Sequence, residues 1–268
     1  MDWTLELSNE YARADLFHVY VPSSNLISIV APVYNEAENI GPFIQGIEDA
    51  VKEPHEIVIV YDFPEDNTLP AIAAMQPQVP SVRPVHNTLG KGVLNAIKAG
   101  FAAAEGDVIV FMAADRADEP RDVPAMVRLV RQGADVAAGS RYMRGGKQIG
   151  KKVFKQLLSR MAGLTLHYFT ALPTHDATNN FRAYSRRVIS MPIESTASFA
   201  LGMELVLKAH WQGWRIAEVP TTWMDRTAGT SRFKLFAWLP QYLRWYFLAY
   251  RYAWLPGKWK PSKIDVHN

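Results

Sequence analysis

The sequence contains no cysteine, which excludes disulfide bonds and thiolate metal sites and is in keeping with a cytosolic location. It has no run of about 18 or more uncharged apolar residues, so we expect no ordinary transmembrane helix. The first residues carry several acids and lack a basic segment followed by an apolar one, so we expect no signal peptide. Internal repeats and low-complexity tracts are also absent from the sequence.

The composition is that of a globular protein. A chain of 268 residues, 49% of them hydrophobic, can bury one sizeable core with a small appendage. The formal net charge of +3 fits an anionic substrate or an anionic membrane surface, although it is weak support for either. We expect no nucleic-acid partner.

Apolar strands alternate with helices through much of the chain. Runs of apolar residues predict strands at residues 26–33, 56–61, 82–85, 107–112 and 135–138. Helical spacing predicts helices at residues 35–52, 68–76, 91–104, 122–132 and 199–211. This alternation predicts a doubly wound α/β fold, a mostly parallel sheet with helices on both faces. Ligands bind such sheets beyond the carboxyl ends of the strands.

The strand at 107–112 leads to an acidic residue, Asp115. Mg²⁺ is usually held by one or two carboxylates together with substrate phosphates, so Asp115 could suffice as a metal ligand. Asp118 is a candidate helper, but Asp118 and Glu119 could instead begin the next helix, where acids suit the helix dipole. Basic side chains could also neutralise a phosphate group without metal.

Three loops after strands have both a structural and a functional interpretation. Residues 32–36 could be a strand-to-helix turn, and residues 61–68 a turn built by proline, aspartate and asparagine. Lys91 lies between two glycines, which could simply let one stretch of backbone come close to another. The segment is not a Walker A loop. Alternatively, Asp62 could accept from a base or ribose, and Lys91 could lie near a nucleotide.

Two later segments carry candidate phosphate-binding residues. Arg141 follows the strand at 135–138, and a basic stretch including Lys155 comes after it. This stretch could be an anion site for a lipid phosphate or the basic face of an amphipathic helix. Asp176 precedes a Thr-Asn-Asn-Phe-Arg run, where local capping is the usual role of an aspartate.

Taken in order from about residue 26 to 232, these motifs resemble family 2 of the GT-A glycosyltransferases, particularly the dolichol-phosphate mannose synthase type. That family has Pro-x-Tyr-Asn-Glu in the first loop and an Asp-x-Asp tip after the fourth strand. The chain departs from the family at Tyr61, Phe63 and Pro64 in the second loop and at Ala113, which replaces the first Asp of the tip.

The resemblance implies a GT-A fold and transfer of a hexose from a GDP- or UDP-hexose to a polyprenyl phosphate. It implies Mg²⁺ or Mn²⁺ at a site weakened by Ala113, with Asp115 as the metal ligand. The catalytic residues would be Asp115, Arg141, Asp176 and Arg226. The donor nucleotide would contact Pro32, Tyr34, Glu36, Asp62, Lys91, Ala114, Asp115 and Arg232. The acceptor phosphate would contact Arg141, Lys155 and Ser159.

Two alternatives to this function remain open. A family 2 transferase acting on a hydroxyl acceptor would need a carboxylate base, for which Asp176 and Glu204 are candidates. A catalytically silent homologue that binds a nucleotide sugar is the other alternative.

The segment 233–255 is dense in tryptophan and tyrosine, which favour a membrane–water interface. Pro240 argues against one straight helix, so we expect one or two in-plane amphipathic helices that hold the enzyme on the cytoplasmic face of a membrane. The alternatives are packing on the catalytic core and a homodimer contact. The expected division is therefore a catalytic part at 1–232 and a membrane-associating segment with its tail at 233–268.

Overall fold

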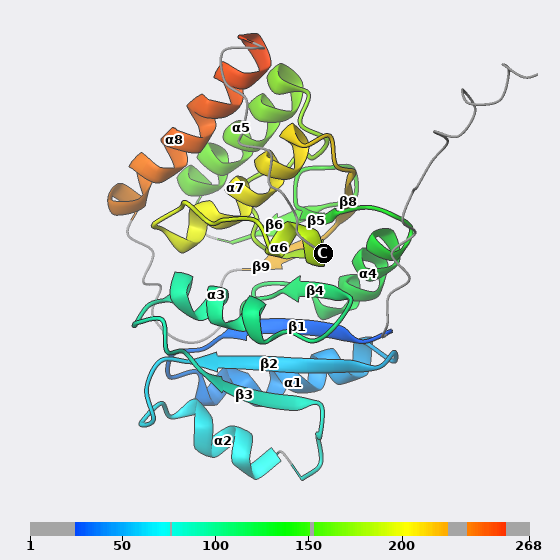
Figure 1. Ribbon diagram of the computed structural model, residues 1–268, viewed down its shortest axis with the longest axis vertical. Helices are drawn as coiled ribbons and strands as arrows, with labels where there is room; N and C mark the ends of the chain where they lie inside the picture. Colours follow the sequence, from blue (N-terminus) through cyan, green and yellow to red (C-terminus); the bar gives the residue numbers. More distant parts are fainter. Residues whose placement is uncertain (1–24, 76, 151–152, 225–234, 256–268) are drawn as a thin grey trace, which may run out of the picture.

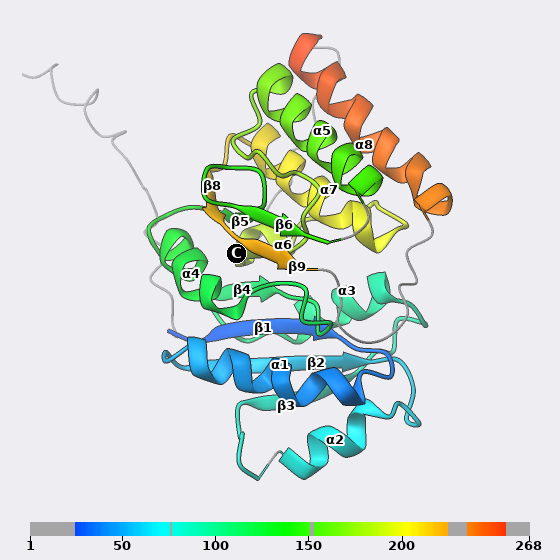
Figure 2. The same cartoon turned by 180° about the vertical axis from the view of Figure 1, so that it is seen from behind.

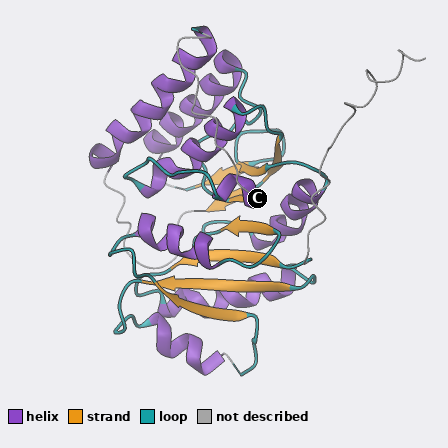
Figure 3. Ribbon diagram, viewed as in Figure 1, coloured by secondary structure: helices purple, strands orange, loops and turns teal. Residues whose placement is uncertain are grey.

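The computed structural model describes residues 25–75, 77–150, 153–224 and 235–255. They form a seven-stranded sheet with helices on both faces and a separate two-stranded ribbon (Figures 1 and 3). The strands of the main sheet, in the order β3-β2-β1-β4-β7-β5-β8, are Val82–His86, His55–Tyr61, Ile27–Pro32, Val108–Phe111, Arg182–Ser185, Val136–Ser140 and Ile216–Pro220. All neighbouring pairs are parallel except those of β7, which is antiparallel to β4 and β5. The ribbon pairs β6 (Lys147–Ile149) with β9 (Thr222–Met224).

The α-helices occupy the two faces of the sheet and one layer beyond it. They are α1 (Ala37–Ala50), α2 (Thr68–Met75), α3 (Val93–Ala103), α4 (Val123–Arg131), α5 (Val153–Thr170), α6 (Arg186–Ile189), α7 (Ser198–Trp211) and α8 (Leu235–Trp254). A 3₁₀ turn, η1 (Pro120–Asp122), leads into α4. Figure 2 shows α1 and α4 in front of the sheet, whereas α3 lies in front of it in the opposite view.

The central strands are buried on both faces because their side chains alternate between two apolar clusters. Ile27, Ile29 and Ala31 of β1 pack with α1 and α4, whereas Val30 packs on the other side with α3 and α7. Gly100 of α3 permits a close approach to the sheet, since a Cβ there would lie 2.4 Å from Val30 Cγ1. The two-sided core explains why the strands read as continuous apolar runs.

The structure confirms the predicted α/β architecture, and the predicted strands and helices begin and end close to the observed ones. The sequence did not predict β7. This strand inserts between β4 and β5 and reverses direction, so the sheet is mixed in its second half.

Helix α8 packs on α5 and α7, which form a layer outside the sheet (Figure 1). Trp245 of α8 is 1% exposed and donates from Nε1 to Ser195 Oγ at 2.8 Å, and Tyr246 Oη lies 2.9 Å from Thr165 Oγ1 of α5. One face of α8 therefore packs on the core, the alternative considered for this segment. The segment forms one helix, α8, which continues through Pro240, within the expected one or two helices. No helix among the described residues is both long and apolar enough to cross a membrane.

Candidate active site at the carboxyl edge of the sheet

Six loops meet at one edge of the sheet. The parallel strands β1, β2, β3, β4 and β5 all end there, and β7 begins there because it runs the opposite way. Loops that carry Glu36, Asp62, Asp115, Arg141 and Asp176 are thereby gathered along this edge. Parallel strands and one reversed strand are thus enough to bring together residues more than 100 positions apart.

The first two loops are held to each other by Asp66, which is 1% exposed. Its carboxylate accepts from the backbone N–H of Asn35 at 3.1 Å and from the hydroxyl of Thr68 at 2.5 Å. Thr68 Oγ1 in turn accepts from the backbone N–H of Glu36 at 2.9 Å. Asn35 has a φ of 55°, a left-handed conformation that asparagine tolerates better than most residues. Asp66 and Thr68 therefore shape the first loop rather than face a ligand.

The predicted base-binding residues lie on this shaped loop. Pro32 ends β1, and Tyr34 is 42% exposed with its ring edge-on to Phe63 at 5.2 Å between centroids. Glu36 Oε2 accepts from Asn39 Nδ2 at 2.6 Å. A pocket of about 230 Å³ is lined by the start of α1 together with Asn67.

Asp62 ties the second loop to the glycine loop around Lys91. Its Oδ1 accepts from Asn87 Nδ2 at 2.7 Å, and its Oδ2 accepts from the backbone N–H of Gly92 at 2.8 Å. Gly92 has a φ of 125°, which a side-chain-bearing residue rarely adopts. Lys91 is consequently presented to solvent beside Asp62. Asn87, which the sequence analysis did not single out, could have been found as a polar residue at the end of a strand.

The acidic tip after β4 is a tight turn around Asp115, which is 8% exposed. Asp115 Oδ1 accepts from the backbone N–H of Ala117 at 3.1 Å, and Arg116 between them has a φ of 61°. Met224 of β9 donates its backbone N–H to Ala117 O at 2.9 Å, which ties the turn to the ribbon. Ala114 is buried at 3% exposure, so it can contribute only backbone and its methyl group at this edge.

The acids that follow Asp115 have different surroundings. Glu119 caps η1 by accepting from the backbone N–H of Arg121 at 3.5 Å, and Asp122 Oδ2 accepts from Thr221 Oγ1 at 2.6 Å. Oδ1 of Asp118 is buried and has no hydrogen-bond partner among the described residues. Burial, and then the charge of Asp115, raises the pKa of Asp118 to about 8.

Arg141 and Asp176 form a buried ion pair at this edge, after β5 and before β7. Arg141 Nε donates to Asp176 Oδ2 at 2.7 Å and its Nη2 donates to Oδ1 at 2.9 Å, which is a bidentate geometry. The side chain of Asp176 is 0% exposed and that of Arg141 is 8% exposed. Burial alone would raise the pKa of Asp176, but the Arg141 charge and hydrogen bonds to the carboxylate hold this pKa below its usual value.

Hydroxyl groups extend this ion pair toward α5. Arg141 Nη2 also donates to Ser159 Oγ at 3.1 Å and to Thr178 Oγ1 at 2.9 Å. Tyr142 donates from its hydroxyl to Ser159 Oγ at 2.8 Å. Two predicted phosphate contacts, Arg141 and Ser159, are therefore adjacent. Thr178 is the first residue of the Thr-Asn-Asn-Phe-Arg run, but it was not predicted as a site residue.

Two contacts to its backbone fix the Asp176 loop, one from α5 and one from β7. Gly163 of α5 lies so close that a Cβ there would be 2.5 Å from the carbonyl oxygen of His175. Arg182, at the start of β7 and 0% exposed, donates from Nη2 to the carbonyl oxygens of Asp176 at 3.1 Å and Ala177 at 2.9 Å. The loop is therefore fixed from both sides.

The two carboxylates considered as bases for a hydroxyl acceptor are both engaged inside the protein. Asp176 is paired with Arg141, as described above. Glu204 is 0% exposed, accepts from the backbone N–H groups of Glu194 and Ser195 at 2.6 and 2.8 Å, and pairs with Lys208 Nζ at 2.7 Å. Neither arrangement presents an available carboxylate oxygen to an acceptor hydroxyl.

Three predicted site residues cannot be placed. Arg226 and Arg232 lie outside the described residues, and the side chain of Lys155 is outside the described part of α5. The described residues contain no group of three or more histidine, aspartate or glutamate side chains arranged to hold a metal ion. A metal at the acidic tip would therefore need oxygens from a bound phosphate.

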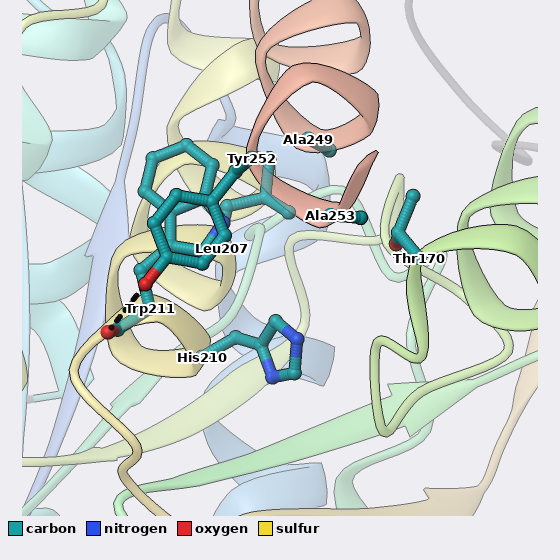
Figure 4. A pocket seen from close by; sticks show the side chains of 7 residues that line it. All are labelled: Thr170, Leu207, His210, Trp211, Ala249, Tyr252 and Ala253. Atoms are coloured by element: carbon teal, nitrogen blue, oxygen red, sulfur yellow. Dashed lines mark hydrogen bonds between the residues drawn. The ribbon is translucent and has the colours of Figure 1, made fainter. Parts of the chain in front are cut away.

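A second pocket, of about 210 Å³, lies between α5, α7 and α8 (Figure 4). It is lined by Thr170, Leu207, His210, Trp211, Ala249, Tyr252 and Ala253. Tyr252 donates from its hydroxyl to Trp211 O at 3.3 Å across one wall. Thr170 ends α5, eleven residues after Ser159, or roughly 16 Å along a helix, so this pocket is separate from the sheet edge.

Comparisons with known proteins identify relatives of this arrangement. The model of the family Glycosyl transferase family 2 matches residues 28–190. A dolichol-phosphate mannosyltransferase of Pyrococcus furiosus is 31% identical over 213 residues, 78% of this chain, which spans 59% of the length of that relative. An undecaprenyl-phosphate mannosyltransferase of Micrococcus luteus is 30% identical over 209 residues, which are 76% of this chain and 85% of that protein.

Among solved structures, the glucosyl-3-phosphoglycerate synthase of Mycobacterium tuberculosis, crystallised with Mn²⁺, uridine diphosphate and its product, has a similar fold. The TM-score is 0.63 at 20% sequence identity, and the match covers 84% of this chain and 80% of that one. This likeness concerns the fold alone.

Proposed function

The chain belongs to glycosyl transferase family 2, and we propose that it transfers a hexose from a GDP- or UDP-hexose to a polyprenyl phosphate. The printed names of its relatives, a dolichol-phosphate and an undecaprenyl-phosphate mannosyltransferase, support a lipid-phosphate acceptor and favour mannose as the sugar. The structural neighbour that binds uridine diphosphate and Mn²⁺ supports a nucleotide-sugar donor and a divalent cation.

The observation that carries this proposal is the two-sided character of α5. On its inner side, Ser159 lies 3.1 Å from Arg141 Nη2, where a phosphate could be bound. On its outer side, Leu157, Met161 and Tyr168 are 54%, 55% and 70% exposed, with the spacing of one helical face. One helix thus joins a cationic site to an apolar surface, which suits an acceptor made of a phosphate on a hydrocarbon chain.

Helix α8, which packs beside α5, also has exposed apolar residues. Leu243 and Phe247 are 40% and 62% exposed, one helical turn apart, while Trp245 on the other face is buried. Exposed apolar faces on two neighbouring helices are typical of an interaction surface. We assign this surface to a membrane, with the enzyme peripheral on its cytoplasmic face, and keep the division into a catalytic part at 1–232 and a membrane-associating segment at 233–268.

The chemistry of this reaction asks little of a general base. A phosphate acceptor is already an anion at neutral pH, so positioning it and neutralising the leaving diphosphate would supply most of the catalysis. Arg141, Ser159 and Lys155 would orient the acceptor phosphate, and Asp115 would serve the donor side. Arg226 and Arg232 would contact the donor diphosphate, since guanidinium groups bind phosphate bidentately. When bound, a divalent cation would contribute positive charge at that diphosphate.

The donor nucleotide is assigned to the first three loops. Pro32, Tyr34, Glu36 and Asp62 would contact the base and ribose, and Lys91 and Ala114 would lie nearer the phosphates. The exposed ring of Tyr34 and the partly exposed Asp62 support this assignment.

A transfer assay tests the acceptor. Purified protein is incubated with radiolabelled GDP-mannose, GDP-glucose or UDP-glucose and either a polyprenyl phosphate or the matching polyprenol, with Mg²⁺, Mn²⁺ or EDTA. We expect labelled lipid from the phosphate and none from the alcohol. Product from the polyprenol would favour a hydroxyl acceptor, and no product despite nucleotide binding would favour a silent homologue.

Ser159→Ala tests the acceptor site more locally. It should raise the KM for polyprenyl phosphate several-fold and leave the KM for the donor unchanged. Thr165→Ala, on the same helix but paired with Tyr246, is the matched control and should leave both constants near wild type. An unchanged lipid KM in Ser159→Ala would remove Ser159 from the acceptor site.

Vesicle sedimentation tests the membrane surface. The double variant Leu157→Glu/Met161→Glu should lose binding to phosphatidylglycerol-containing vesicles. Leu89→Glu replaces a residue that is 56% exposed at the sheet edge, and this control should bind as the wild type does. Equal binding by all three proteins would place the membrane contact elsewhere.

A further inference from the structure

The acidic tip lacks a carboxylate at position 113, yet three residues after Asp115 it has an acid, Asp118, whose buried Oδ1 has no hydrogen-bond partner among the described residues. Ala113 has no oxygen in its side chain, and the turn around Asp115 is fixed by the Asp115–Ala117 hydrogen bond and by Met224. With Asp115 as its sole protein ligand, a cation at this edge would be bound by one protein carboxylate. Mg²⁺ and Mn²⁺ sites with substrate phosphates commonly have one or two.

Each neighbouring acid except Asp118 has a structural role that the hydrogen bonds account for. Glu119 caps η1, and Asp122 accepts from Thr221 Oγ1 of the strand connection. Oδ1 of Asp118 is buried and accepts no hydrogen bond among the described residues. An unpartnered buried carboxylate oxygen costs stability, so a protein that keeps one has usually reserved it for a ligand or an ion.

The position of Asp118 fits such a role. Among nearby charges, Asp115 acts on Asp118 most strongly, followed by Arg141 and Asp176 of the buried ion pair. The charges of Asp115 and of the Arg141–Asp176 pair both act on Asp118, so Asp118 lies near both.

We propose that Asp118 replaces the carboxylate missing at position 113, so that Asp115 and Asp118 together bind the divalent cation of the donor diphosphate. The inference rests on the proposed function for the diphosphate, and it concerns residues that hold the cation, with phosphate oxygens and water completing the shell. Arg116, which lies between the two acids in the sequence, has a left-handed conformation with a φ of 61°, so the chain does not run straight from one acid to the other.

Mn²⁺ binding measured without turnover tests this proposal. Isothermal titration of the full chain with Mn²⁺ is done in the presence of saturating GDP and, separately, saturating UDP. Asp118→Asn should weaken Mn²⁺ binding tenfold or more, as Asp115→Asn should. Glu119→Gln changes the adjacent acid and should stay within twofold of wild type. Thermal unfolding without metal checks that the variants are folded.

A rescue variant separates a metal ligand from a merely structural residue. Adding Ala113→Asp to Asp118→Asn should restore most of the lost Mn²⁺ affinity, because it supplies a carboxylate at the other end of the turn. Wild-type affinity in Asp118→Asn would overturn the proposal, as would transfer that is undiminished in EDTA. Mn²⁺ binding that depends on Asp118 in a protein with no lipid-phosphate transfer would retain this inference and reject the proposed acceptor.

Discussion

Replacing Arg141 with alanine should destabilise the fold as well as impair the site, because Arg141 neutralises a carboxylate that has no access to solvent. Asp176 is 0% exposed and would lose two charge-assisted bonds, at 2.7 and 2.9 Å. Removing one partner of a buried ion pair typically costs about 3–5 kcal/mol. Three donors would remain, namely the backbone N–H groups of residue 141 and Asn179 and the hydroxyl of Thr178.

These remaining donors place the expected cost near the lower end of that range, at about 3 kcal/mol. The measurement is urea unfolding followed by tryptophan fluorescence at pH 7, with the midpoint and the m-value fitted separately. The matched surface control is Arg121→Ala, whose side chain is 87% exposed and whose contact with Glu119 is 3.8 Å. Its unfolding free energy should stay within about 0.5 kcal/mol of wild type.

A double-mutant cycle isolates the pair from the rest of the site. Asp176→Asn should also destabilise the protein, and the combined variant should cost less than the sum of the two single variants by roughly 1–3 kcal/mol. The pKa of Asp176, held low by Arg141, also predicts the pH dependence: the pair contributes full stability above the ordinary aspartate pKa and loses it as the pH falls through the lowered value. An Arg141→Ala protein within about 1 kcal/mol of wild type would refute the buried pair.

Further predictions concern three other positions. Gly163→Ala should lower kcat and leave α5 helical by circular dichroism, because a Cβ would lie 2.5 Å from the carbonyl oxygen of His175 and push the Asp176 loop aside. Trp245→Ala should cost about 3–5 kcal/mol in urea unfolding, since its side chain is 1% exposed and bonded to Ser195; no change would mean that α8 is detached from the core in solution. The Asp118→Asn variant should be more stable than the wild type at pH 8 in EDTA by a few kcal/mol, on the order expected from the raised pKa of Asp118 in the wild type. Near pH 4 the two proteins should be equally stable. Equal stability at both pH 8 and pH 4 would contradict the buried, unpartnered carboxylate oxygen of Asp118.

The parallel half of the fold could be predicted from the sequence because its signals are local. The runs Ile57–Val60 and Val108–Phe111 are apolar without interruption, as strands buried on both faces require. The helix at 122–132 places Val123, Met126, Val127 and Val130 on one face. Since each strand ends in a polar loop, the rule that ligands bind at carboxyl ends also located Asp62, Asp115 and Arg141.

The antiparallel strand β7 could not be predicted in the same way. It has four residues, of which Arg182 is charged and yet 0% exposed. Its burial depends on pairing with β4 and β5 and on carbonyl oxygens that accept from Arg182, including those of residues 176 and 177. These contacts are set by the tertiary fold, so no periodicity in the sequence reports them.

The same reasoning explains why the site was predicted only in part. The sequence identified Arg141 and Asp176 as separate candidates, Arg141 as a contact of the acceptor phosphate and Asp176 as a catalytic residue or a carboxylate base. Their bidentate pairing spans 35 residues and requires β7 to begin at the edge where β5 ends. A short-range pattern does not report that Arg141 is already paired with Asp176 in the folded protein.

The carboxylates along this edge can be sorted by what their oxygens already accept. Asp66 closes the first loop, Asp62 fixes the glycine loop, and Asp176 holds Arg141, so each is required by the fold before any ligand arrives. Asp118 is the exception among the acids described above, because its buried Oδ1 stabilises nothing in the described protein. Desolvating that oxygen costs folding free energy, and the protein recovers this cost only when a cation or a hydrogen-bond donor is bound to the oxygen. On the proposal that Asp118 binds the cation, the departure at Ala113 shifts the cation site and does not remove it, and Asp118 is the residue on which that distinction depends.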